Sequence, residues 1–280
     1  MFALRKFLDR FAGRSAVMGI VNVTGDSFSE GIYSTPDSAV DRAEQLLADG
    51  ADLLDVGAES TRPGASEVSV QNEIHRLIPV IEIIMRRHPG VVLSIDTRHA
   101  ETADAALSAG AGIINDVSML NFSPGMAEVV AKHGAGLILN HSRSTPDIMQ
   151  SEKFTTYPRG VAAEVAEELA AAKAKAVAAG VEPDNILLDP GIGFAKNSEQ
   201  CWELLRNLTA VDKPERMAVG ISRKSFLAAV TAEARPRERD SETLAVELEL
   251  AKRKIAMIRT HDVKSLVKAL RVLAHFNLES

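Results

Sequence analysis

Eight short apolar runs, each followed by a longer segment with helical spacing, constrain the fold of this chain more than any other feature. The runs are rich in Val, Ile and Leu and read AVMGIVN, DLLDVG, VVLSID, GIIND, GLILNH, NILLDPG, MAVGIS and AMIRTH. Alternation of such runs with helices is typical of a parallel sheet. Helices are expected at 38–49 and 161–179, the second closed by Gly180 with Pro183 just beyond.

Eight strands, eight helical segments and no linker rich in Pro, Gly or Ser predict a single α/β domain, a (β/α)8 TIM barrel, over residues 16–280. A doubly wound sheet is the alternative. Residues 1–15 form an N-terminal extension whose apolar side chains share one helical face, which predicts a short amphipathic helix packed on the barrel. A membrane-surface or targeting segment is the alternative for this stretch, because basic residues flank that face.

Composition excludes several classes of partner. The 280 residues are 46% hydrophobic, which suffices for a full core, and the net charge of −6 comes from interspersed signs, so no nucleic-acid partner is expected. No apolar run approaches the roughly 20 residues that span a bilayer, so no membrane partner is expected. The single cysteine, Cys201, excludes an internal disulfide and fits a cytoplasmic location. The charged stretch 233–242 is expected to be a solvated loop without a function.

Polar side chains stand at the ends of all eight predicted strands. They are Asn22, Asp55, Asp96, Asn115, Asp116, Asn140, His141, Asp189, Ser222, Arg223, Lys224, Arg259 and His261. In a barrel the C-terminal strand ends and the loops after them form one mouth, so these residues are candidates for a site. A single Asp or Asn in such a place can instead cap the next helix. Capping does not account for the set, because caps need neither Lys nor Arg.

These residue types suit a ligand that has a hydrogen-bonding heterocycle and an anionic tail. The carboxylate of Asp189 can accept two parallel N–H bonds from an amino-pyrimidinone edge, and Asn115 can offer both a donor and an acceptor. Arg259, His261 and Arg62 can bind phosphate oxygens. Arg259 can alternatively serve only as an ion-pair partner for Asp262 or for another carboxylate of the mouth. The glycines of DPGIGF can allow close approach to a flat ring or form an ordinary tight turn.

At these residues the sequence resembles the dihydropteroate synthase family of folate biosynthesis, from about residue 17 to residue 273. The segments that carry the resemblance are MGIVNVTGDSFSEG, DVGAESTRPGASEVS, SIDTRHA, GIINDVS, HSRSTPDIMQ, LLDPGIGFAKN, GISRKSFL and MIRTHDV. The family reaction joins 6-hydroxymethyl-7,8-dihydropterin pyrophosphate to para-aminobenzoate and gives 7,8-dihydropteroate and pyrophosphate. The resemblance implies this transferase activity, a Mg²⁺ cofactor and a homodimer.

The resemblance also implies a role for particular residues. It places Asp55, Asp96, Asn115, Asp189, Gly193, Phe194 and Lys224 around the pterin ring. It places Asn22, Arg62, Arg259 and His261 around the pyrophosphate, and Asn22 at the Mg²⁺ ion. It places Phe28, Thr61, Pro63, Ser222 and Lys224 around para-aminobenzoate, the site that sulfonamide drugs occupy. Catalytic roles are implied for Asp26, Arg62, Asp96 and Lys224.

The chain departs from the family pattern at three places. Gly25 stands where proline usually follows the threonine of the first loop, which is expected to loosen that loop. Asn140 and Ser142 flank His141 where methionines are common, so a more polar pocket wall is expected. Lys254 and Ile255 replace a usual Gly-Ala pair before the last strand, which puts that turn in doubt.

Two other functions remain open from the sequence. A paralogue that binds pterin without synthesis would explain the departures, although every charged position that the chemistry needs is occupied. A methyltransferase that uses methyltetrahydrofolate would share the fold and the pterin contacts. Such an enzyme has no use for the pyrophosphate-binding cations of SRKS and RTH, and this argues against it.

Overall fold

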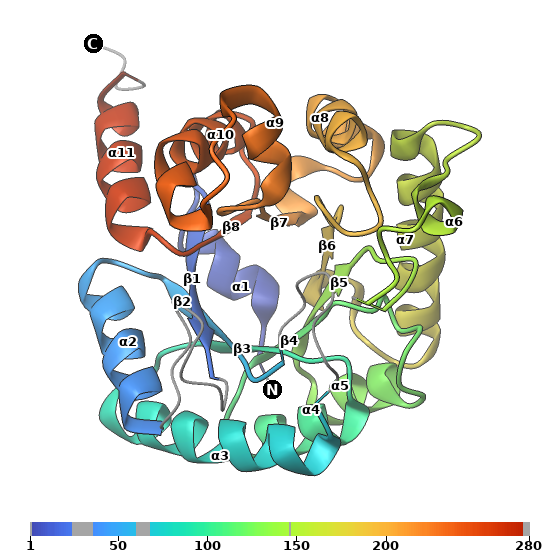
Figure 1. Cartoon of the computed structure of the whole chain (residues 1–280). Helices are drawn as coiled ribbons and strands as arrows, with labels where there is room; N and C mark the ends of the chain where they lie inside the picture. Colours follow the sequence, from blue (N-terminus) through green and yellow to red (C-terminus); the bar gives the residue numbers. More distant parts are fainter. Residues whose placement is uncertain (1, 24–35, 60–67, 146, 277–280) are drawn as a thin grey trace.

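The eight expected strands form one closed parallel barrel. The structure is a computed structural model that describes residues 2–23, 36–59, 68–145 and 147–276. Within these residues the strand order is β6-β5-β4-β3-β2-β1-β8-β7, and a parallel bridge between Leu188 and Met217 joins the two remaining edges. Figure 1 shows the strands in the centre with helices around them. The single-domain (β/α)8 barrel is thus confirmed, and closure rules out the doubly wound sheet.

The bounds of the elements agree with the sequence pattern to within about two residues. The strands are β1 Ala16–Asn22, β2 Leu53–Gly57, β3 Leu93–Asp96, β4 Ile113–Asp116, β5 Gly136–Asn140, β6 Ile186–Asp189, β7 Ala218–Gly220 and β8 Met257–Thr260. The helices in the described residues are α1 Leu4–Asp9, α2 Pro36–Ala48, α3 Val70–Arg87, α4 Ala100–Ser108, α5 Met126–His133, α6 Glu152–Thr155, α7 Val161–Ala178, α8 Ser198–Arg206, α9 Ala228–Thr231, α10 Asp240–Lys252 and α11 Val263–Phe276. Gly180 has a φ of 100° and ends α7 as predicted.

The barrel interior is built in layers by the two-residue repeat of the strands. The bottom layer is apolar and consists of Met18, Leu53, Ile113, Ile138, Leu187, Ala218 and Met257. Alternate residues of a strand point to the same face, so the side chains two residues further along lie above this layer. On β2, β4, β6 and β8 these are Asp55, Asn115, Asp189 and Arg259. The apolar layer therefore supports a polar one at the C-terminal end of the barrel.

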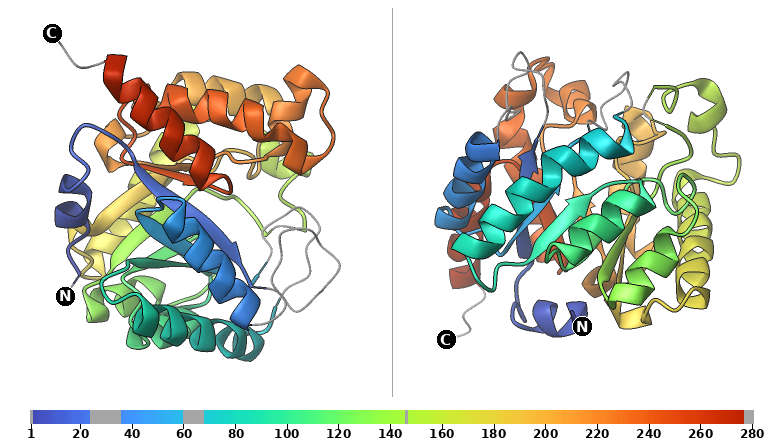
Figure 2. Two further views of the ribbon diagram at one scale, coloured as in Figure 1. Left: turned by 90° about the vertical axis from the view of Figure 1, so that its left-hand side faces the viewer. Right: turned by 90° about the horizontal axis from the view of Figure 1, so that it is seen from below.

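Helix α1 closes the opposite end of the barrel. Its Leu4 and Phe7 are buried against the apolar layer. The Leu4 N–H donates to Asn185 Oδ1 at 2.9 Å, and Asn185 Nδ2 donates to the Phe2 carbonyl at 3.1 Å. Figure 2 shows α1 at one open end of the barrel, outside the ring of outer helices. The N-terminal residues therefore contribute to the core, and the apolar layer separates them from the polar one.

The charged stretch 233–242 is only partly the solvated loop that the sequence suggested. Most of its residues are exposed, but Arg239 is buried. The Arg239 guanidinium donates to the carbonyls of Glu233, Ala234 and Arg223. The expectation was wrong for Arg239, because a guanidinium whose three nitrogens all donate to carbonyls can be buried in a loop and tie it to the chain after β7.

The turn before β8, which the sequence left in doubt, is a regular C-terminal capping turn of α10. One of its positions holds an unusual residue type. The Lys254 N–H donates to the Ala251 carbonyl, and the Ile255 N–H donates to the Leu250 carbonyl. This is the Schellman pattern, in which the residue after the C-cap is usually glycine. Here Lys254 occupies that position with a φ of 61°.

Replacing Lys254 with glycine is expected to stabilise the protein by about 0.5–1 kcal/mol. The left-handed conformation disfavours a residue with a Cβ by roughly 1–2 kcal/mol, and the extra freedom of glycine in the unfolded chain offsets part of the gain. Urea denaturation would show a higher midpoint with an unchanged m-value. The matched control is Lys252→Gly in the last turn of α10, which should destabilise. A lower midpoint for Lys254→Gly would contradict the assignment of strain to this turn.

Candidate active site

The polar end of the barrel opens into a cavity of 710 Å³, a size typical of small-molecule sites. Nine of the residues predicted from the sequence line it: Asn22, Asp96, Gly193, Phe194, Ser222, Arg223, Lys224, Arg259 and His261. Asp55, Asn115 and Asp189 are buried in the polar layer of the barrel interior. The predicted residues Asp26, Phe28, Thr61, Arg62 and Pro63, together with Gly25, lie outside the described residues.

The floor of the cavity is an ion-pair cluster centred on Arg259. Its Nη2 donates to Asp96 Oδ2 at 2.7 Å, and its Nε donates to Asp55 Oδ2. Asn115 Nδ2 donates to the same oxygen of Asp55 at 3.1 Å. Arg259 is therefore an ion-pair partner of mouth carboxylates, one of the two readings that the sequence allowed. Its side chain also keeps 22% of its surface exposed on the cavity side, so the guanidinium borders both the carboxylates and the open mouth.

Asp96 and Lys224, which both line the cavity, titrate near neutral pH. Burial raises the pKa of Asp96 to about 7, although the positive charge of Arg259 opposes the shift. Burial lowers the pKa of Lys224 to about 8, against the opposing effect of Asp189. Burial likewise raises the pKa of Asp189. Shifted carboxyl and ammonium groups that face one cavity are typical of catalytic sites.

The loop after β6 forms one wall of the cavity. Asp189 Oδ1 accepts the Gly191 N–H at 2.8 Å, and Lys224 Nζ lies 4.6 Å from the centre of the Phe194 ring. Gly191 has a φ of 64°, and a Cβ there would meet the His141 carbonyl oxygen at 2.0 Å. The tight-turn reading therefore holds for Gly191, whose close approach is to the backbone after β5.

One side of the cavity, lined from the ends of β1, β7 and β8, carries the groups suited to an anion. The His261 N–H donates to Ser222 Oγ at 3.2 Å, and His261 Nδ1 lies 3.0 Å from the same oxygen. Arg42 from α2 donates to the His261 carbonyl at 2.7 Å and fixes the chain after β8. Asn22 at the end of β1 lines the same cavity. This side thus presents an imidazole, a hydroxyl and an amide beside Arg259.

Three strand-end candidates bond chiefly to other parts of the protein, and of these three Arg223 alone also lines the cavity. Asp116 accepts the backbone N–H groups of Ser118 and Leu120, so it holds the turn after β4 and does not cap α5, whose N-cap is Gly125. Arg223 forms a two-bond ion pair with Asp240 and fixes the loop after β7 to α10. His141 is fully buried behind the wall. Asn140 and Ser142, which were expected to make the cavity wall more polar, are also buried, and neither is among the residues that line this cavity.

Sequence reasoning missed Lys196, which is buried behind the wall and borders the cavity. Its Nζ lies 2.9 Å from His141 Nδ1 and donates to the carbonyls of Gly191 and Phe194. The sequence contained a signal for Lys196, because a lysine that directly follows the glycine-rich end of a barrel strand lies near the mouth of the barrel. A solvent-exposed lysine just before α8 would give the same sequence pattern, however, so the burial of Lys196 could not be predicted.

Comparison with known proteins agrees with this arrangement. Residues 18–261 match the family of pterin binding enzymes, the class that the barrel and its mouth define. The chain is 40% identical over 271 residues to a dihydropteroate synthase of Mycobacterium leprae, covering 92% of both chains. It is 39% identical to one from Synechocystis over 92% of this chain and 89% of that protein. The chain belongs to the dihydropteroate synthase family and is a transferase.

Solved structures show the same similarity. A Yersinia pestis dihydropteroate synthase with a sulfonamide drug complex superimposes with a TM-score of 0.88 at 37% identity, over 95% of each chain. A Xanthomonas albilineans dihydropteroate synthase in complex with 7,8-dihydropteroate superimposes with a TM-score of 0.83 at 35% identity, again over 95% of each chain. The methyltransferase alternative is set aside by these relationships.

Proposed function

We propose that this protein condenses 6-hydroxymethyl-7,8-dihydropterin pyrophosphate with para-aminobenzoate to give 7,8-dihydropteroate and pyrophosphate. The observation that carries the proposal is a cavity with anion-binding side chains in its lining and a buried layer of carboxylates and an amide at its floor, which Arg259 joins. A substrate with a heterocycle at one end and a pyrophosphate at the other matches that division.

The polar layer would bind the pterin ring. Asp189 would accept two parallel N–H bonds from the amino-pyrimidinone edge, and each charge-assisted bond contributes about 1.5–3 kcal/mol. Asn115 and Asp96 would meet the remaining ring nitrogens, while Asp55 holds the amide of Asn115 in place. Phe194 and Lys224 would border the ring from the wall.

Bond cleavage would be driven by electrostatics. When pyrophosphate leaves, positive charge develops on the pterin methylene, and the ionised carboxylate of Asp96 stabilises it. Arg259 and His261 stabilise the departing anion. The arylamine of para-aminobenzoate then attacks the methylene, and its nitrogen loses one proton to the solvent as the C–N bond forms, so no protein nucleophile is needed. Ser222 and Lys224 would contribute to the para-aminobenzoate site, and Asp26, Phe28, Thr61, Arg62 and Pro63 keep the roles that the family resemblance implies.

The cavity suits a magnesium ion that is bound largely by substrate. No group of three or more His, Cys, Asp or Glu side chains in the described residues could hold a metal by itself. Mg²⁺ commonly takes one or two protein oxygens and completes its shell with phosphate oxygens and water, and the Asn22 amide supplies such an oxygen beside the anion side. When bound, the ion would neutralise charge on the leaving pyrophosphate.

Two further features belong to the proposal. The protein would act as a homodimer, as the family resemblance implies, and in the cytoplasm, which the single cysteine fits. No helix in the described residues is long and apolar enough to cross a membrane. Light scattering at micromolar concentration tests the dimer, and a monomer there would remove it.

Turnover tests the proposed function directly. With Mg²⁺ and both substrates, pyrophosphate and 7,8-dihydropteroate are expected to form in equal amounts. A pyrophosphate assay measures the first product and chromatography the second. Without para-aminobenzoate, no dihydropteroate can form. The control is the Lys224→Met variant, which should lose most of this activity because Lys224 borders both proposed substrate sites. Tight pterin binding by folded protein without dihydropteroate would instead identify an inactive paralogue.

A further inference from the structure

Every backbone carbonyl of the segment Gly191–Ala195, which we call the wall loop, accepts a hydrogen bond from the side chain of another residue. Lys196 Nζ donates to the carbonyls of Gly191 at 3.0 Å and Phe194 at 2.9 Å, Lys224 Nζ to that of Ile192, Gln150 Nε2 to that of Gly193 at 2.8 Å, and Tyr157 Oη to that of Ala195 at 3.0 Å. The wall loop lies between β6 and α8 and is neither strand nor helix. Its shape therefore depends on these donors.

Lys196 makes the largest share of these bonds. Besides the two carbonyls of the wall loop, its Nζ lies 2.9 Å from Nδ1 of His141. An ammonium has three N–H donors, and these three acceptors use all of them. The residue is only 3% exposed, and burial lowers its pKa to about 7. Such a lysine is committed to the protein and has no donor left for a substrate.

His141 links Lys196 to a carboxylate on α7. Its Nε2 lies 3.0 Å from Glu168 Oε2. Burial and the nearby charge of Lys196 lower the pKa of His141 to about 4, so the ring is neutral at physiological pH. Since Nδ1 accepts from Lys196, the ring proton lies on Nε2 and is donated to Glu168. This tautomer is assigned from the hydrogen-bond network.

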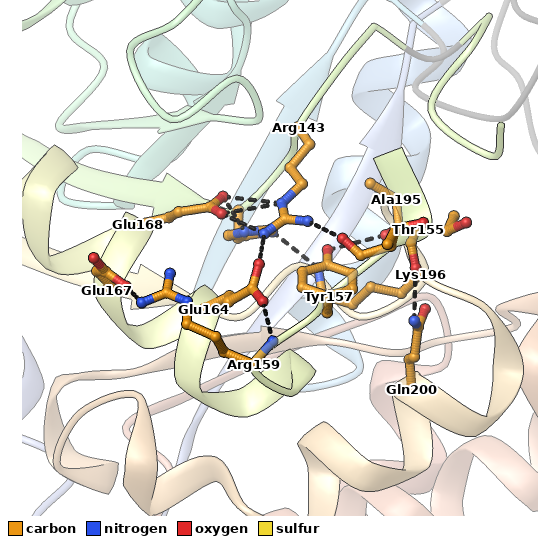
Figure 3. Close-up of polar contacts among 12 residues, drawn as sticks. Arg143, Thr155, Tyr157, Arg159, Glu164, Glu167, Glu168, Ala195, Lys196 and Gln200 are labelled. Carbon is orange, nitrogen blue, oxygen red and sulfur yellow. Dashed lines mark hydrogen bonds and ion pairs between the residues drawn. The ribbon is translucent and has the colours of Figure 1, made fainter. Parts of the chain in front are cut away.

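Arg143 fixes the far end of this chain of contacts. Its guanidinium donates to Glu168 and, at 2.6 Å, to Glu164 Oε2. It also lies 3.8 Å from the centre of the Tyr157 ring, whose hydroxyl holds Ala195 (Figure 3). Burial alone would raise the pKa of Glu168, but bonds from His141 and Arg143 lower it to about 2. Glu168 is therefore an anion that orients both partners.

We propose that Lys196 is a positioning residue of the pterin site. Anchored by His141 and Glu168, its ammonium holds the wall loop in the shape that presents Gly193 and Phe194 to the cavity. The inference rests on the proposed function, because Phe194 can border a pterin ring only if the cavity binds one. Lys196 itself acts through the wall loop without touching the substrate.

The test is equilibrium binding of 6-hydroxymethyl-7,8-dihydropterin pyrophosphate, measured by calorimetry without para-aminobenzoate. Lys196→Met keeps the aliphatic stem and removes the three donors, and it is expected to weaken binding about 10- to 100-fold. Affinity for inorganic pyrophosphate should change less than about 2-fold, because the anion side is untouched. The matched control is Lys173→Met, which removes a lysine from α7 that pairs with Asp212. It should change neither affinity.

Coupling to Phe194 separates positioning from general loss of structure. If Lys196 acts through the wall loop, Lys196→Met should weaken binding much less in a Phe194→Ala background than in the wild type, whereas an unrelated structural effect would be additive. Tyr157→Phe removes only the donor to Ala195 and keeps the ring beneath Arg143, so it covers the case in which Lys196→Met fails to fold. It should weaken pterin binding about 2- to 5-fold with an unchanged melting temperature.

The outcomes distinguish this inference from the proposed function. Wild-type protein that does not bind the pterin ester would contradict the proposed function. Normal wild-type binding together with unchanged affinity in folded Lys196→Met and in Tyr157→Phe would overturn the role of Lys196 and leave the proposed function intact. Parallel losses of pterin and pyrophosphate affinity in Lys196→Met would also overturn it, because they would show a general collapse of the site.

Discussion

Replacing Asp189 with alanine is expected to remove pterin binding almost entirely. Two charge-assisted hydrogen bonds of about 1.5–3 kcal/mol each would be lost, which corresponds to roughly a 100- to 10,000-fold weaker affinity. The pterin donors would also face a buried site without an acceptor, which adds a desolvation penalty. Calorimetry with 6-hydroxymethyl-7,8-dihydropterin pyrophosphate measures the effect.

Two further variants make this result specific. Asp189→Asn keeps an oxygen for the Gly191 N–H and so preserves the turn, but it brings an amide donor toward the donors of the ring and should lose most of the affinity. Asp184→Ala removes an exposed aspartate that pairs with Arg216 just before the same strand, at its opposite end, and should bind normally. Unchanged affinity in Asp189→Ala would refute the assignment of Asp189 to the ring.

The sequence predicted the barrel well because two independent patterns agree in it. Apolar runs fix the strands, and the residue two positions after each buried apolar side chain faces the same interior. Asp55, Asn115, Asp189 and Arg259 follow Leu53, Ile113, Leu187 and Met257 in this way. The two-residue period of the strands and the closure of the barrel therefore predict where the polar layer lies. This prediction needs no knowledge of side-chain contacts.

Pairing among the site residues could not be predicted in the same way. Arg259 had several carboxylates within reach, and only the register of β8 beside β1, with β2 and β3 beyond, selects Asp55 and Asp96. His141 follows β5 in phase with the outward-facing side chains, so it turns behind the wall to Lys196 and Glu168. Such choices depend on three-dimensional register and on burial, which a single sequence does not reveal.

Replacing Arg259 with methionine is expected to shift the acidic limb of the kcat/KM profile to higher pH and to lower its plateau at least about 100-fold. In the wild type, Asp96 ionises near pH 7 with help from the positive charge of Arg259. Loss of that charge disfavours the carboxylate, so the pKa of Asp96 rises and the activity that needs its ionised form appears only at higher pH. Initial rates between pH 6 and 9 measure the shift.

The free energy of unfolding of Arg259→Met should depend on the same titration of Asp96. Removing one partner of a buried ion pair destabilises by about 3–5 kcal/mol, and here Asp55 and Asp96 would both lose their cation. A proton on Asp96 relieves the repulsion, so the loss in free energy of unfolding should be larger at pH 8.5 than at pH 6. Arg223→Met, which breaks the more exposed pair with Asp240, is the control and should show no such dependence.

Adding Asp55→Asn to Arg259→Met provides the decisive comparison. The negative charge of Asp55 raises the pKa of Asp96, so removing it should move the acidic limb back toward lower pH and recover part of the stability at pH 8.5. Catalysis should stay weak, because the pyrophosphate side still lacks its guanidinium. A double variant whose acidic limb stays where Arg259→Met placed it would show that Asp96 is not the group that titrates.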